Sequence, residues 1–199
     1  MTLERIHRLA DFIIARLLKR KKVSPPCCSG CFHCCREAVY CTDAEVRLML
    51  LHVKSEDVSR ITFALHQWGT RFKALPFKDS KEPPALEYRA AWLWCPFLID
   101  GKCSVYEHRP LACRMHVAIE SARGCVEDKL RAQQKFALFP ALGEVLGLKH
   151  IKTLRPGESI TYDHLGVLLY KEVYGEDRPT KSRIRFSVQG DDLIVEKYA

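Results

Sequence analysis

The sequence lacks the short motifs that mark most catalytic and nucleotide-binding sites. It has no glycine-rich phosphate-binding loop, because Gly143 and Gly147 stand alone. It also lacks the zinc-protease pattern H-E-x-x-H and the C-x3-C-x2-C triad of radical enzymes, since its first cysteine spacing is x2. No cysteine is separate from the others, as a lone nucleophile would be. Motifs therefore leave open whether the protein is an enzyme.

Long hydrophobic runs are missing as well. No run of about 18 uncharged apolar residues occurs, so no transmembrane helix is expected. Residues 1–22 carry seven lysines and arginines, and acidic residues interrupt their apolar stretch. A secretory signal has an uninterrupted apolar run and a small-residue cleavage site, and neither is visible. We therefore expect an intracellular, cytoplasmic protein in which thiols stay reduced.

The composition otherwise suits an ordinary folded protein. The chain has 199 residues, of which 47% are hydrophobic and 28% charged, and its formal net charge is +8. That length fits one domain, or one domain with a small appendage, and can bury a core without crosslinks. The ten cysteines are the exception, because all of them lie between residues 27 and 125. They require a chemical explanation.

The first cysteine segment, residues 27–35, reads CCSGCFHCC. Adjacent cysteines rarely join in a disulfide, because the bond needs Cα atoms about 5.5 Å apart with suitable orientation. A C-x2-C spacing instead lets one turn direct two thiolates at one cation. Metal or cluster ligation is the favoured interpretation. Disulfides, redox thiols and inert packing are the alternatives.

Hydrophobic periodicity and turn residues predict a chain of many short elements. Apolar residues at helical spacing predict a helix over residues 3–20 with a basic opposite face. Thr42 and Glu45 have capping-box spacing, and Asp100-Gly101 is a hairpin turn dipeptide. Further helices are expected over 43–54, 55–75, 107–115, 126–138 and 162–173, and hairpins over 95–106 and 183–198. The predicted fold class is α+β, mostly helical with short hairpins, organised around a cysteine-ligated metal centre.

Three parts are expected along the chain. Residues 1–24 form a basic amphipathic N-terminal helix, residues 25–150 a cysteine-cluster metal-binding domain, and residues 151–199 a C-terminal helix and β-hairpin extension. We expect the first helix mainly to pack its apolar face on the body of the protein. Docking to a protein partner or an anionic membrane is a second interpretation, and nucleic acid is the least favoured partner.

Eight of the cysteines form a constellation in two halves. Cys28, Cys31, Cys34 and Cys35 give C-x2-C-x2-C-C, and Cys95, Cys103, Cys113 and Cys125 follow with gaps of 7, 9 and 11 residues. The second half contains the run Tyr106-Glu107-x-Arg109-Pro110-x-x-Cys113-Arg114. With these motifs, residues 27–130 resemble the YkgJ-like cysteine-cluster family, which is named for its CxxCxxCC motif.

The resemblance implies a zinc- or iron-chelating domain in which those eight cysteines are the cofactor and metal ligands. Members of the family are mostly small bacterial proteins. A related cysteine cluster occurs in flagellin lysine N-methylases, which are longer. Cys27 and Cys41, the basic first helix and the C-terminal part of the chain lie outside the shared pattern.

The metal is a choice between an iron–sulfur cluster and zinc. Tetrahedral zinc takes four ligands and a cubane cluster takes four cysteines, so eight could serve two such sites or one larger assembly. Structural zinc sites usually combine two C-x2-C knuckles, and only the first half has them. Three close cysteines joined to a distant Cys95-Pro96 are nearer to bacterial ferredoxin usage, although the fourth spacing differs. An iron–sulfur cluster is favoured, and zinc is the alternative.

Four other side chains lie near the cysteines in sequence. Arg109 and Arg114 flank Cys113, where we expect them either to offset thiolate charge or to form a structural salt bridge. His33 and His116 could each replace a thiolate, but eight available cysteines make this a minor expectation.

Three functional hypotheses follow. The first is a cytoplasmic metal-binding protein, holding an iron–sulfur cluster or zinc, with a redox or electron-transfer role. The second is a metal-dependent enzyme related to the flagellin lysine N-methylases, which would need an open coordination position. The third is a zinc-stapled protein-interaction module that docks through its basic helix or its C-terminal hairpin. The sequence identifies no particular partner or substrate.

Overall fold

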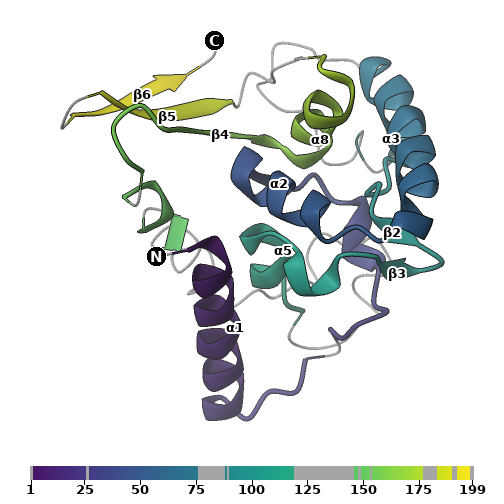
Figure 1. The fold of residues 1–199 in the computed structure, drawn as a ribbon. Coiled ribbons are helices and arrows are strands. Elements are labelled where there is room, and N and C mark those ends of the chain that lie inside the picture. The colour runs from purple at the N-terminus through teal and green to yellow at the C-terminus, as the bar shows by residue number, and fades with distance from the viewer. Residues whose placement is uncertain are drawn as a thin grey trace.

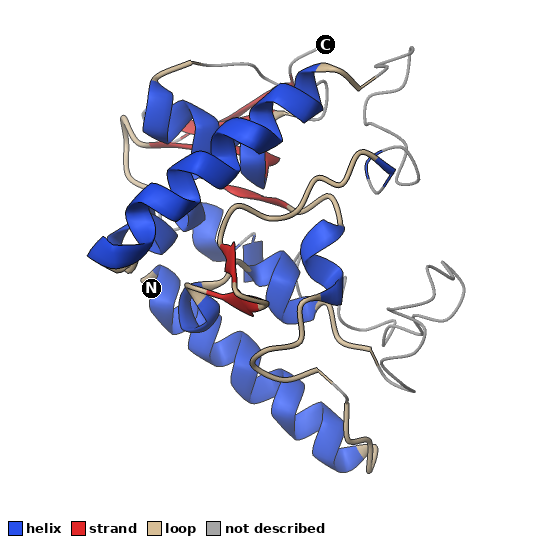
Figure 2. Cartoon of the chain, turned by 90° about the vertical axis from the view of Figure 1, so that its right-hand side faces the viewer, coloured by secondary structure: helices blue, strands red, loops and turns tan. Residues whose placement is uncertain are grey.

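The computed structural model describes residues 2–25, 27–75, 88, 90–118, 146–147, 149–152, 154–176, 183–189 and 192–197. Within them the fold is α+β: helices and short antiparallel strands, as the sequence predicts (Figures 1 and 2). The helices are α1 (Leu3–Arg20), α2 (Asp43–Leu51), α3 (Val58–Lys73), α5 (Leu111–Met115) and α8 (Leu165–Tyr174). The described part of the chain also has three 3₁₀ helices, at His33–Arg36 (η1), Ser55–Asp57 (η2) and Tyr106–His108 (η3). None of the described helices combines the length and apolar character needed to cross a membrane.

The N-terminal helix and the capping box lie where the sequence places them. Helix α1 spans Leu3–Arg20 and ends on Lys19 and Arg20, whose charges suit the helix dipole. At the start of α2, the Thr42 side chain accepts the Glu45 N–H, and the Glu45 carboxylate accepts the Thr42 N–H at 2.9 Å. The predicted helix over 126–138 lies outside the described residues.

A four-stranded antiparallel sheet has the order β1-β4-β5-β6, with strands Tyr40–Thr42, Ser159–His164, Ile184–Gln189 and Asp192–Lys197. Strand β4 corrects the predicted helix over 162–173: the residues up to His164 are a strand, and α8 begins at Leu165. The strand prevails because Tyr40–Thr42 and Ile184–Gln189 pair with it on both sides. The terminal β5–β6 hairpin is confirmed, since the two strands pair antiparallel from Ile184 and Lys197 to Gln189 and Asp192.

The second sheet is the predicted hairpin of β2 (Leu98–Ile99) and β3 (Lys102–Cys103). Its turn residues Asp100 and Gly101 both have positive φ, 49° and 73°, as a two-residue hairpin turn of type I′ requires. A side chain at Gly101 would contact the Phe32 ring, so the hairpin packs closely over the first cysteine segment.

Two clusters of buried side chains hold the elements together. The larger one joins α2, α3 and α8 and includes Val46, Leu65, Trp68 and Leu168. The smaller one joins α1 to α5 and includes Ile6, Ile14 and Met115. In both views α1 lies at the end of the molecule away from α8 and the four-stranded sheet (Figures 1 and 2). The division into residues 1–24, 25–150 and 151–199 stays a prediction.

Candidate metal centre

The two halves of the cysteine constellation meet directly in the backbone. The N–H of Cys95 donates to the carbonyl oxygen of Cys35 at 2.7 Å, across 59 intervening residues. In the first half, a turn brings the Cys31 N–H within 3.0 Å of the Cys28 carbonyl oxygen. Gly30 in that turn has a φ of 92°, a conformation that glycine adopts without strain. The short turn therefore places Cys28 and Cys31 close together.

The β2–β3 hairpin and helix α5 position the described cysteines of the second half. Cys95 precedes the β2–β3 hairpin and Cys103 ends β3. A further backbone hydrogen bond joins the two ends of the hairpin: the Ser104 N–H donates to the Phe97 carbonyl oxygen at 2.9 Å. Cys113 lies in α5, whose first residues follow Pro110.

One cavity of about 230 Å³ lies between these segments. Eight cysteines line it: Cys27, Cys28, Cys31, Cys34, Cys35, Cys95, Cys103 and Cys113. Helix α1 contributes a wall, through Asp11, Ile14 and Leu18 on one face. No signal in the sequence predicts that wall, because the apolar face of a buried helix has the same pattern whether it covers a core or a metal site.

Seven of the eight predicted ligands therefore share one cavity, and Cys125 lies outside the described residues. The two remaining cysteines differ from each other. Cys27 lines the cavity, whereas Cys41 is 1% exposed, lies in the larger core cluster on β1 and is not a lining residue. The assignment of the eight cysteines as ligands stays a prediction.

The adjacent cysteines Cys34 and Cys35 interact through their side chains. Their hydrogen bond is the largest cause of both pKa shifts: it lowers the pKa of Cys34 and raises that of Cys35. Of the two adjacent thiols, Cys34 is therefore the one that loses its proton more readily. A thiolate is the form that binds metal.

The thiols of the second half are held in their neutral form. Burial is the largest cause of the raised pKa of Cys103 and of Cys113, and it raises the pKa of Cys95 to about 12. Negative charge on Cys34 raises the pKa of all three further. Negative charge on one of these four sulfurs therefore disfavours negative charge on the others, and a bound cation would relieve that effect.

Arg109 provides a positive charge at the cavity. Its guanidinium lies 3.9 Å from the centre of the Tyr106 ring and donates to the Tyr106 carbonyl oxygen at 2.9 Å. From there it acts to lower the pKa of Cys34, Cys103 and Cys113, against the larger effects on each. This contact fits the expected offset of thiolate charge.

Arg114 has a structural position instead. Its side chain is buried and forms an ion pair with Asp11 of α1. It also donates to the carbonyl oxygens of Glu107 and Arg109, the latter at 2.8 Å. For Arg114, the structural salt bridge that the sequence analysis considers therefore exists, and it joins α5 to Asp11 of α1.

The donor chemistry fits a thiophilic metal, because soft sulfur ligands suit zinc and iron–sulfur clusters alike. His116 also lines the cavity, whereas His33 is not among its lining residues. Among the residues that the structure describes, no three His, Cys, Asp or Glu side chains already form a group that could hold a metal ion. The sulfurs share a cavity without having converged on one point.

Comparisons with known proteins agree with this chemistry. The family model CxxCxxCC, described as a putative zinc- or iron-chelating domain, matches residues 27–137. Neither the curated proteins nor the solved structures contain a match to the chain.

Proposed function

Because the chain belongs to the CxxCxxCC family of zinc- or iron-chelating domains, we propose that its cavity holds an iron–sulfur cluster and serves electron transfer or redox sensing in the cytoplasm. The proposed ligands are drawn from Cys28, Cys31, Cys34, Cys35, Cys95, Cys103, Cys113 and Cys125. The observation that carries the proposal is that seven of these line one cavity. Zinc is the alternative metal.

The surroundings of the cavity favour a cluster over zinc. Apolar side chains complete its walls, among them Val39, Met49 and Leu165. Two independent tetrahedral zinc sites would use two separate sets of four ligands, whereas here thiols from both halves share a single space. When bound, an iron–sulfur cluster supplies one-electron exchange, and burial and nearby charge adjust its potential. The chain's own residues hold it, exclude water and, through Arg109, offset its negative charge.

Metal and sulfide analysis after anaerobic purification tests this proposal. Iron with acid-labile sulfide and a brown colour would support the cluster, and zinc in a colourless protein would support the alternative. The variants Cys31→Ala and Cys113→Ala should each lose metal and melt at lower temperature. Full metal content and unchanged melting in both variants would rule out these ligands.

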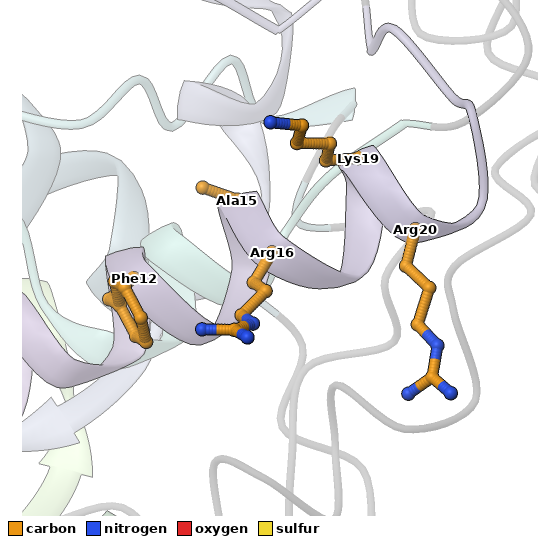
Figure 3. A pocket seen from close by; sticks show the side chains of 5 residues that line it. All are labelled: Phe12, Ala15, Arg16, Lys19 and Arg20. Carbon is orange, nitrogen blue, oxygen red and sulfur yellow. The ribbon is translucent and has the colours of Figure 1, made fainter.

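A second candidate is a docking role for α1. Its exposed side carries Arg5, Arg8, Arg16, Lys19 and Arg20, and Phe12 among them is 58% exposed. Arg16 lies 5.8 Å from the Phe12 ring centre. Figure 3 shows Phe12, Arg16 and Arg20 extending to the same side of the helix, where α1 borders a hollow of about 620 Å³.

An acidic protein surface suits this side of α1 best. Aromatic and arginine side chains are the common anchors of protein interfaces. A membrane would require a broad apolar face, and the apolar face of α1 is already packed on α5. Ala15 lines both the hollow and the cysteine cavity, so a partner docked here would lie one helix away from the metal centre.

Poly-L-glutamate is a suitable probe of this surface. Replacing Arg16, Lys19 and Arg20 by glutamine should weaken its binding at least about tenfold. The matched control replaces three exposed lysines elsewhere, Lys54, Lys149 and Lys152, and should change binding much less. Equal effects of the two triple variants would exclude a specific docking site. Tighter binding to phosphatidylserine vesicles or duplex DNA would assign the surface to another class of partner.

Catalysis, by analogy with the flagellin lysine N-methylases, stays a hypothesis without a structural observation behind it.

A further inference from the structure

Cys27 lies outside the shared cysteine pattern, yet it lies in the same cavity as the proposed ligands. Its Sγ accepts the backbone N–H of Ala118 at 3.2 Å, which joins the start of the first cysteine segment to the residues after α5. Backbone N–H groups that donate to sulfur are a usual feature around metal-bound thiolates. The position of Cys27 thus has both the location and the hydrogen bond of a ligand.

Cys27 shares the cavity with its neighbour Cys28. Both line it together with Tyr106 of η3. Cys28 is exposed and Cys27 partly buried, with Cys27 packed against the cluster that includes Ile14 and Met115.

We propose that Cys27 is an additional thiolate ligand of the metal centre, at the opposite end of residues 27–35 from the Cys34–Cys35 pair. The inference rests on the proposed function, since it presupposes that the cavity binds metal. Cys41 supplies the contrast: it is also outside the shared pattern, but it is buried in the core and does not line the cavity. The two extra cysteines therefore have different roles.

Cobalt(II) loading of the full-length chain tests the proposal, because sulfur-to-cobalt charge-transfer absorption reports the thiolates bound. We expect Cys27→Ser to change the charge-transfer spectrum and to speed metal release to EDTA at least about tenfold. A serine hydroxyl can still accept the Ala118 N–H, so the variant tests ligation more than packing. The control Cys41→Ala should leave spectrum and release rate unchanged.

Alkylation of the wild-type protein gives a reading that needs no variant. Iodoacetamide, followed by mass spectrometry, should modify Cys27 at least about tenfold more slowly once cobalt is bound. Equal alkylation of Cys27 with and without cobalt would overturn the proposal. So would a Cys27→Ser variant with an unchanged charge-transfer spectrum, even if cobalt protects Cys27 in the wild-type protein. A wild-type protein with no charge-transfer band would instead refute metal binding by the cavity itself.

Discussion

At the scale of single residues, Glu45 connects three helices. The residue is 4% exposed, and its carboxylate accepts the Leu111 N–H at 2.8 Å, the Thr42 N–H at 2.9 Å and a hydrogen bond from His7 Nε2 at 3.3 Å. Burial would raise the pKa of Glu45, but these hydrogen bonds lower it below its ordinary value. One side chain of α2 thereby fixes both α1 and α5, which border the cavity.

Glu45→Ala should lower the free energy of unfolding by about 2–4 kcal/mol, because it leaves several buried donors without an acceptor. Urea denaturation at fixed metal content measures this. The control Glu56→Ala removes an exposed glutamate and should change stability by less than about 0.5 kcal/mol. Similar losses in the two variants would show that Glu45 does not have this connecting role.

His164 makes stability depend on pH. Its ring is buried against Trp68, its Nδ1 accepts the Gly166 N–H at 3.1 Å, and its Nε2 has no hydrogen-bond partner in the described part of the chain. Burial lowers the pKa of His164 from 6.5 to about 3. Below pH 6.5 the unfolded chain therefore binds a proton that the native protein does not, so stability falls as pH falls.

Replacing His164 by asparagine keeps an acceptor for the Gly166 N–H and removes the titrating ring. Between pH 8 and pH 5 the wild-type protein should lose about 2 kcal/mol more stability than His164→Asn, from about 1.4 kcal/mol per pH unit below 6.5. Denaturation curves of both proteins across this range measure the difference. Parallel pH profiles would show that His164 is not the responsible group.

At the scale of elements, α3 and α8 each have a glycine that leaves room for an aromatic ring of the other helix. A Cβ at Gly69 of α3 would lie 2.6 Å from the Tyr170 ring, and one at Gly166 of α8 would lie 2.4 Å from the Trp68 ring. Trp68 is held in place, because it is buried and its Nε1 donates to the Tyr88 hydroxyl at 3.1 Å. The crossing of the two helices therefore depends on both glycines.

Gly166→Ala should destabilise the protein by about 1–3 kcal/mol, because the methyl group overpacks against the fixed Trp68 ring. Gly147→Ala is the matched control, since a Cβ there meets nothing within 4 Å. In a helical position that change should be neutral or stabilising by up to about 1 kcal/mol. Thermal melts of the two variants check the contrast, and a stabilised Gly166→Ala would contradict the packing argument.

Local signals explain which elements could be predicted. The β2–β3 hairpin closes over Asp100-Gly101, a turn dipeptide that is visible in the sequence, and alternating apolar and polar residues predict the paired strands β5 and β6. Strand β1 has three residues, too few for a periodic pattern, and its partner β4 lies more than 100 residues away. Because of that distant pairing, the residues up to His164 form a strand, although the local sequence predicts a helix.

At the scale of the whole molecule, the site also combines local features that the sequence predicts with tertiary features that it does not. Cysteine spacing in a local turn predicts the ligands of the first half, and the family resemblance adds those of the second half; seven of the eight line the cavity. Spacing could not separate Cys27 from Cys41, since only the tertiary fold brings Ala118 to one and buries the other in β1. Nor could it show that α1 closes the cavity, which depends on Asp11 meeting Arg114.

Metal removal should therefore loosen one part of the molecule more than another. The centre would crosslink Cys35 to Cys95 across 59 residues, and closing such a loop costs on the order of 4 kcal/mol. We expect chelation to lower the melting temperature by on the order of 10 °C. Amide exchange should become fast in α1, residues 27–39 and α5, which surround the cavity, while α3 and α8 keep their protection through Leu65, Trp68 and Leu168. Uniform loss of protection across both groups would mean that the two clusters unfold as one unit, and unchanged exchange would mean that metal has no structural role.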